Sequence, residues 1–129
     1  MSKIVIMLAV SILVVHGIIH LMGTAVYMKL AEINGLSYKT TLLSGRLDLG
    51  EGGSRVFGAL WVLPAIGFIV AALALLEGWE WWQPVMVGVT LLSLALTGLD
   101  WSGAFMGAII DIAILALLWL GPRIAGWFA

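Results

Sequence analysis

The stretch Val15-His16-Gly17-Ile18-Ile19-His20 decides how this chain is expected to fold, because it places both histidines of the sequence inside a long apolar run. Residues four apart in a helix lie on the same face, so His16 and His20 share one face. An ionisable side chain at membrane depth is costly, and such side chains face the interior of a helix bundle, where a polar partner binds them. Asp111, in the last apolar segment of the chain, is the expected partner.

The composition indicates an integral membrane protein. Hydrophobic residues make up 63% of the 129 residues and charged residues 10%, with a mean hydropathy of +1.16, which is far from the composition of soluble domains. A transmembrane helix needs about 20 apolar residues, so the chain has room for four crossings and little else. We therefore predict an all-α, antiparallel four-transmembrane-helix bundle that forms one domain over residues 1–129, with spans at about residues 4–26, 55–76, 84–99 and 103–120.

The same composition excludes several classes of function. A net charge of -1 leaves no basic surface to neutralise phosphates, so a nucleic-acid partner is not expected. The sequence contains no cysteine, which excludes disulfides, thiolate metal sites and a cysteine nucleophile. The expected surroundings are the lipid bilayer of a cell membrane, which for a bacterial protein is the inner membrane, crossed several times.

The only long connection between the expected spans is a loop at residues 34–54. The first span is expected to end near Val26, or to continue as a helix to a turn at Asn34-Gly35, and the stretch Gly50-Glu51-Gly52-Gly53 is expected to be flexible. Loops of this length often act as lids or binding segments. Ser54 is a plausible N-cap of the second span, and Pro64 is expected to kink that span near residues 60–64.

His16 and Asp111 are expected to lie at a similar depth along the bundle. In an antiparallel bundle the long loop and the turn at residues 100–103 share one end, and His16 and Asp111 lie about ten and about nine residues from it, a similar height at about 1.5 Å per residue. The polar side chains then form a funnel that opens toward the long loop. The candidate ligand-binding residues are His16, His20, Tyr27, Glu51, Arg55, Trp61, Thr97, Asp100, Trp101 and Asp111.

The third span carries Thr90, Ser93 and Thr97 on the helix face that also holds Asp100. Hydroxyl groups at this spacing usually bond to their own helix or to a neighbouring one, so we interpret them as structural. The hairpin at residues 77–84 contains three tryptophans, as expected of an aromatic belt at headgroup level.

Several chemistries are compatible with His16, His20 and Asp111, which are also the candidate catalytic residues. Two histidines and a carboxylate form a ligand set for Zn, Cu or Fe, although a metal site is not the favoured reading. An acid and a base in a dry pocket could transfer protons on a lipophilic substrate. Haem within one chain is disfavoured because both histidines share one helix face, which leaves haem between two chains. The remaining alternative is a structural network in an accessory subunit that binds no ligand.

Three short motifs are shared with a known group of proteins. Gly17-Ile18-Ile19-His20-Leu21-Met22-Gly23 in the first span, Ser54-Arg55-Val56-Phe57-Gly58-Ala59-Leu60-Trp61 opening the second and Trp81-Trp82 opening the third resemble small bacterial four-helix membrane proteins of the DoxX-like kind. The resemblance implies a quinone or another lipophilic ligand, and a place in a homo-oligomer or a larger redox complex in the membrane. It implies no catalytic residue. The leading expectation is a bundle that binds a lipophilic small molecule through His16, His20 and Asp111.

Overall fold

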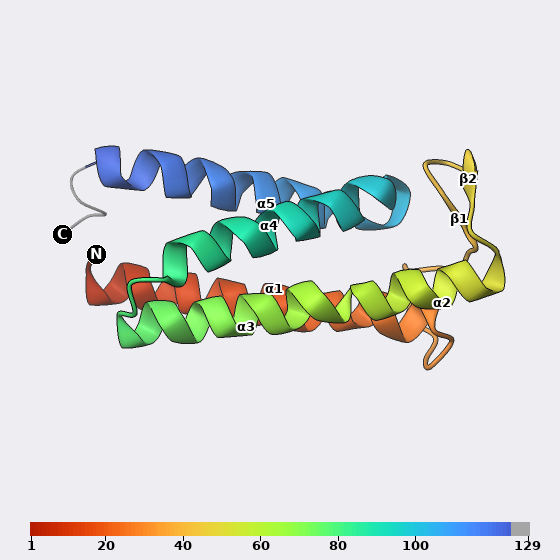
Figure 1. Cartoon of the computed structure of the whole chain (residues 1–129), viewed down its shortest axis with the longest axis horizontal. Helices are drawn as coiled ribbons and strands as arrows, with labels where there is room; N and C mark the ends of the chain where they lie inside the picture. The colour runs from red at the N-terminus through yellow and green to blue at the C-terminus, as the bar shows by residue number, and fades with distance from the viewer. Residues whose placement is uncertain (125–129) are drawn as a thin grey trace.

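The computed structural model describes residues 1–124, which form long helices and one short β-hairpin (Figure 1). The N-terminus, the α3–α4 connection and the end of α5 lie at one end of the molecule, and the hairpin lies at the other. The elements are α1 (Lys3–Tyr27), β1 (Thr41–Leu42), β2 (Leu47–Asp48), α2 (Gly50–Leu60), α3 (Val62–Glu77), α4 (Trp82–Leu99), α5 (Trp101–Leu120) and the 3-10 helix η1 (Gly121–Arg123).

Four helices are long and apolar enough to cross a membrane, if α2 and α3 are taken together as one helix of 28 residues. Their outward sides carry large apolar residues such as Ile12, Ile66 and Ile112, each more than half exposed. The expected all-helical class and the expected four apolar helices are therefore confirmed.

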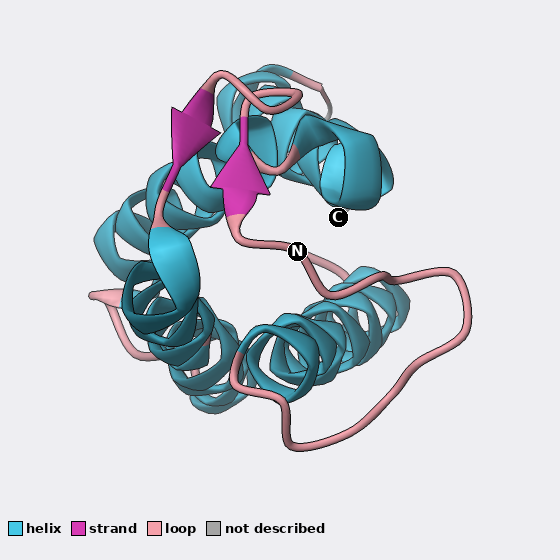
Figure 2. Cartoon of the chain, turned by 90° about the vertical axis from the view of Figure 1, so that its right-hand side faces the viewer, coloured by secondary structure: helices cyan, strands magenta, loops and turns pink. Residues whose placement is uncertain are grey.

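The helices pack in chain order and leave one side of the bundle loosely closed. Helix α1 packs on α2 and α3, α3 packs on α4, and α4 packs on α5, whereas α1 and α5 make no comparable contact within residues 1–124. Seen end-on, the helices form an incomplete ring (Figure 2). We call the line along which α1 faces α5 the α1–α5 seam.

Helix α1 ends at Tyr27, close to the predicted end of the first span at residue 26, and it does not continue to the Asn34-Gly35 turn. Lys29 adopts a left-handed conformation with φ 55, and the N–H of Leu30 donates to the carbonyl of Ala25 at 2.7 Å. This is the Schellman arrangement, which usually has glycine at the left-handed position. The sequence has lysine there, so the usual signal for a helix end is missing.

The segment at residues 50–53 is helical, so the prediction of a flexible glycine stretch was wrong. The antiparallel hairpin of β1 and β2 leads directly into α2, and the side chain of Asp48 accepts a hydrogen bond from the N–H of Gly50 at 3.0 Å. Ser54 is not the N-cap, because its hydroxyl lies inside α2 and donates to the carbonyl of Lys39 at 3.0 Å. The hairpin and α2 thus order much of the predicted loop.

The predicted interruption of the second span is confirmed at Trp61. Pro64 has no N–H to donate to the carbonyl of Leu60, and the chain turns at Trp61 between α2 and α3. The other two spans begin at Trp82 and Trp101, two residues earlier than predicted, and α5 has one non-helical residue at Ala104.

Glycines on α1 allow close packing against the second span. A Cβ atom on Gly17 would lie 3.0 Å from the carbonyl oxygen of Ala65, and one on Gly23 would lie 2.8 Å from the ring of Trp61. Such close approach between helices is typical of small residues at membrane helix interfaces. It holds the histidine face of α1 against the interior of the bundle.

Candidate functional site

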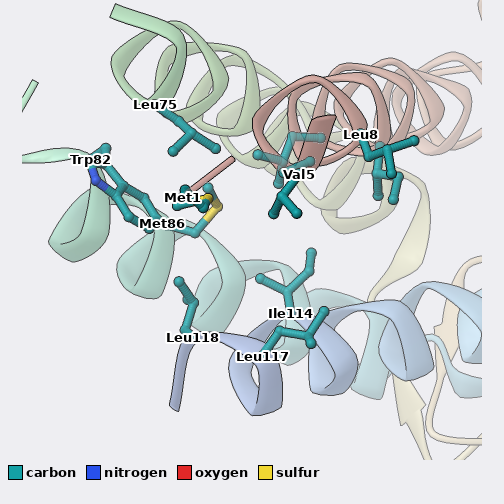
Figure 3. A pocket seen from close by; sticks show the side chains of 12 residues that line it. Met1, Val5, Leu8, Leu75, Trp82, Met86, Ile114, Leu117 and Leu118 are labelled. Carbon is teal, nitrogen blue, oxygen red and sulfur yellow. The ribbon is translucent and has the colours of Figure 1, made fainter. Parts of the chain in front are cut away.

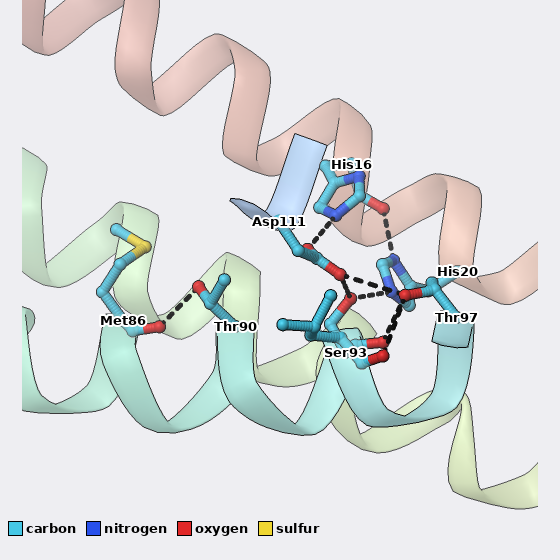
Figure 4. Close-up of polar contacts among 8 residues, drawn as sticks. His16, His20, Met86, Thr90, Ser93, Thr97 and Asp111 are labelled. Carbon is cyan, nitrogen blue, oxygen red and sulfur yellow. Dashed lines mark hydrogen bonds and ion pairs between the residues drawn. The ribbon is translucent and has the colours of Figure 1, made fainter. Parts of the chain in front are cut away.

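The expected contact between the first and the last long helices is present. His16 Nε2 lies 2.8 Å from Asp111 Oδ1, and the two side chains are 3% and 0% exposed (Figure 4). This contact bridges the α1–α5 seam at about the middle of the helices. An isolated carboxylate buried in this way would be strongly unfavourable, so the pairing stabilises both the residue and the closure of the bundle.

Ser93 links the second histidine to the same carboxylate. Its Oγ lies 2.7 Å from His20 Nε2 and 2.6 Å from Asp111 Oδ2, while His20 Nδ1 lies 2.7 Å from the backbone oxygen of His16. We call His16, His20, Ser93 and Asp111 the polar network (Figure 4). Ser93 was not among the predicted site residues, although its place on the polar face of the third span was the signal for it.

The polar network holds one dissociable proton, as a count of hydrogens shows. The His16 carbonyl carries no hydrogen, so His20 Nδ1–H must donate to it. The two contacts of Ser93 Oγ need two hydrogens, and the hydroxyl supplies one. The other lies on His20 Nε2, giving an imidazolium and a carboxylate, or on Asp111 Oδ2, giving two neutral groups. The first pattern becomes the second when His20 Nε2 passes its proton to Ser93 Oγ and Ser93 passes its hydroxyl hydrogen to Asp111 Oδ2.

The neighbouring hydroxyls on α4 bond mainly to their own helix, as predicted. Thr90 donates to the carbonyl of Met86 at 2.7 Å, and Thr97 donates to that of Ser93 at 2.9 Å. Thr97 also lies 3.4 Å from Asp111, at the edge of hydrogen-bond distance.

A second buried carboxylate, Asp100, lies at the end of α4. Tyr27 at the end of α1 donates its hydroxyl hydrogen to Asp100 Oδ2, and Lys39 Nζ lies 2.5 Å from Oδ1. Asp100 is 1% exposed and Lys39 is 29% exposed. The pair therefore fastens the segment before β1 to the α4–α5 turn. The sequence reading named Asp100 and Tyr27 but not Lys39.

A cavity of about 220 Å³ lies beside the polar network, on the hairpin half of the α1–α5 seam. We call it the polar cavity. Five predicted ligand-binding residues line it: His16, His20, Trp61, Thr97 and Asp100. The other lining residues are Ile19, Met22, Gly23, Asn34, Gly35, Leu36, Gly103, Ala104, Met106 and Gly107.

The remaining predicted site residues lie elsewhere. Tyr27 and Asp111 are buried and hydrogen-bonded to lining residues without lining the cavity themselves. Glu51 pairs with Lys29 at 3.4 Å on the exposed surface, Arg55 is exposed, and Trp101 is 54% exposed. These three were predicted to lie in the funnel because they are close to the long-loop end of the helices, whereas residues 34–36 contribute the loop part of the lining.

The opposite half of the seam contains an apolar cavity that the sequence did not indicate. Its volume is about 290 Å³, and its walls come from α1, α3, α4 and α5 (Figure 3). The labelled side chains Val5, Leu8, Leu75 and Ile114 are all apolar. The two cavities lie on opposite sides of the His16–Asp111 contact.

The polar network does not fit a metal site. A histidine ligand needs a free lone pair on a ring nitrogen, but His20 Nδ1 donates to a carbonyl and His20 Nε2 is bonded to Ser93. Both oxygens of Asp111 are already hydrogen-bonded, Oδ1 to His16 and Oδ2 to Ser93. Within residues 1–124, no group of three or more His, Cys, Asp or Glu side chains has a metal-binding arrangement.

Comparisons with known proteins do not add to this description. No protein-family model, no curated protein and no solved structure matches the chain.

Proposed function

We propose that this protein is an integral membrane protein, with four helices crossing the bilayer in antiparallel order, and that its polar cavity binds a lipophilic small molecule. Its place would be a cell membrane, the inner membrane in a bacterium. The proposal is supported by the apolar outer surface and by the exposed Trp79 and Trp81 at one end, where an aromatic belt would lie.

The observation that carries the ligand proposal is the position of the polar cavity. It adjoins the buried network, and its rim on the seam includes the apolar side chains Ile19, Met22 and Met106, which are 37% to 57% exposed. A molecule dissolved in lipid would therefore meet an apolar rim before it met the polar groups inside. Ligand sites in general combine mostly apolar walls with a few polar groups that fix orientation.

A quinone or a lipid fits this description. The DoxX-like resemblance of the three sequence motifs supports a quinone and a role within a larger membrane complex or a homo-oligomer. The cavity volume of about 220 Å³ would hold a headgroup and the first part of a tail, with the rest of the tail lying along the seam.

The experiment is organic mass spectrometry of the protein extracted from its membrane in mild detergent. The matched variants are Ala104→Leu, which fills the polar cavity, and Ala113→Leu, which adds the same side chain at an exposed position of the same helix. We expect one lipophile to copurify with the wild type and with Ala113→Leu, and its amount to fall at least several-fold in Ala104→Leu. Equal amounts in all three proteins would contradict the proposal.

A second candidate is a purely structural role for the polar network. The closed set of hydrogen bonds among His16, His20, Ser93 and Asp111 favours it, because such networks fix helix register without any ligand. Absence of any copurifying lipophile from the wild type, across several lipid environments, would favour this candidate.

A further inference from the structure

Trp61 is held firmly beside the polar cavity. It lies at the turn between α2 and α3, it is 5% exposed, and it lines the cavity. Its ring stacks on Phe57 at 5.8 Å between centroids and lies 5.3 Å from His20. Gly23 makes room for the ring, since a Cβ atom there would lie 2.8 Å from it. The position of the indole is therefore fixed from several sides.

The indole N–H of Trp61 has no hydrogen-bond acceptor among residues 1–124, although its nitrogen is buried. Indole N–H groups are donors only, and a buried donor without a partner is unfavourable. The tryptophan is thus placed for a partner that the described part of the chain does not supply.

Three other buried polar side chains that line the cavity already have partners. Both nitrogens of His20 are hydrogen-bonded, and Thr97 donates to the carbonyl of Ser93. Asp100 is bound by Tyr27 and Lys39. The Trp61 N–H is consequently a buried donor on a residue that lines the cavity, and it has no existing hydrogen bond to break.

We infer that the ligand of the polar cavity is a lipophile with a hydrogen-bond-accepting carbonyl oxygen, and that Trp61 Nε1–H donates to this oxygen. The inference rests on the proposed function, because it names the chemical class of the same ligand. The carbonyl could belong to a small lipophilic ketone or quinone, or to the ester of a membrane lipid. A pure hydrocarbon chain would leave the N–H without a partner.

The test uses two probes of nearly the same shape, benzophenone and diphenylmethane, which differ by a carbonyl against a methylene group. Nitrogen-15 NMR of the full chain in lipid nanodiscs reports each indole N–H separately. The Trp61 resonance is identified by its loss in Trp61→Phe. If Trp61→Phe does not fold, Trp→Phe substitution of each of the other six of the seven tryptophans assigns their resonances, and the one left over belongs to Trp61.

We expect both probes to bind, as shown by changes in the methyl resonances of Met22 and Met106, which line the cavity. Benzophenone should also move the resonance of the Trp61 indole proton downfield, whereas diphenylmethane should not. If both probes perturb the methionines and neither moves the indole proton, the inference is overturned and the proposed function stands. If neither probe perturbs the methionines, both fail.

The source of the natural carbonyl is separated by nanodiscs of ester-linked and of ether-linked phospholipid, without probe. A downfield Trp61 proton in the ester-linked lipid alone assigns the oxygen to a membrane lipid. If the Trp61 indole proton resonates at the same position in both lipids and moves downfield when benzophenone is added, the site is assigned to a small molecule.

Discussion

Asp111 of α5 lies 2.8 Å from His16 of α1, across a seam where the two helices otherwise make little contact. This contact separates the polar cavity from the apolar cavity and joins the first long helix to the last. It also belongs to the polar network. To complete its hydrogen bonds, this network needs one more hydrogen than a neutral His20 and an ionised Asp111 would supply. The stability of the closed bundle should therefore depend on the hydrogen count at Asp111 more than on its charge.

Substitutions of Asp111 test this dependence. In Asp111→Asn the amide oxygen accepts from His16, and the amide N–H donates to Ser93, which then donates to His20, so every contact is satisfied without an extra proton. We expect its free energy of unfolding in detergent to stay within about 1 kcal/mol of the wild type, whereas Asp111→Leu leaves buried partners unpaired and loses about 1–3 kcal/mol or more. Equal losses in the two variants would show that the charge, and not the hydrogen count, matters.

Ser93 should matter more than an ordinary helix serine. Ser93→Ala removes the hydroxyl that joins His20 to Asp111, and we expect a loss of about 1–2 kcal/mol in the free energy of unfolding. Ser11→Ala is the matched control, because Ser11 is exposed and donates only to the carbonyl of Met7 in its own helix at 2.8 Å. Its effect should stay within about 0.5 kcal/mol. Similar effects of the two substitutions would contradict the linking role of Ser93.

The pair of the partly exposed Lys39 with the buried Asp100 should stabilise the hairpin end of the molecule. Lys39→Met leaves Asp100, which is 1% exposed, without its cation, and we expect a loss of about 2–4 kcal/mol. Lys29→Met removes an exposed pair with Glu51, which is worth at most about 1 kcal/mol. Limited proteolysis of residues 34–49 offers a local readout, and it should accelerate only in Lys39→Met. Equal acceleration in Lys29→Met would contradict this reading.

Gly17 should be required for the packing of α1 on α3. In Gly17→Ala the new Cβ lies 3.0 Å from the carbonyl oxygen of Ala65, and a backbone atom in a packed helix cannot easily move away. We expect a loss of about 1–3 kcal/mol in the free energy of unfolding. Gly88→Ala meets open space and should be neutral or stabilising by about 0.5–1 kcal/mol, since alanine favours helix over glycine. A neutral Gly17→Ala would show that the helices are not in close contact there.

The sequence predicted the helices and the central contact well, because both depend on strong physical constraints. Long apolar runs define helices, and two histidines and an aspartate at matched depth have few other partners. The predicted contact between His16 and Asp111 is confirmed by the structure.

The loop was predicted poorly, because its structure depends on individual contacts. The left-handed Lys29, the hydrogen bond from Gly50 to Asp48 and the pair of Lys39 with Asp100 carry no distinctive pattern in the sequence. Glu51, Arg55 and Trp101 were consequently assigned to a site that they do not line. The two cavities also could not be predicted, since they arise from the loose packing of α1 against α5.

Light-induced crosslinking with benzophenone tests the central claim, that the polar cavity binds a lipophile, most directly. Excited benzophenone forms a covalent bond with nearby C–H groups, and methionine side chains react readily. Met106 lines the polar cavity, whereas Met7 does not, although the two are 57% and 56% exposed. We predict that peptide mass spectrometry will find the crosslink on Met106 and Met22 well above Met7, and that Ala104→Leu will abolish this preference. Equal labelling of Met7 and Met106, unchanged by Ala104→Leu, would contradict the binding of a lipophile in this cavity.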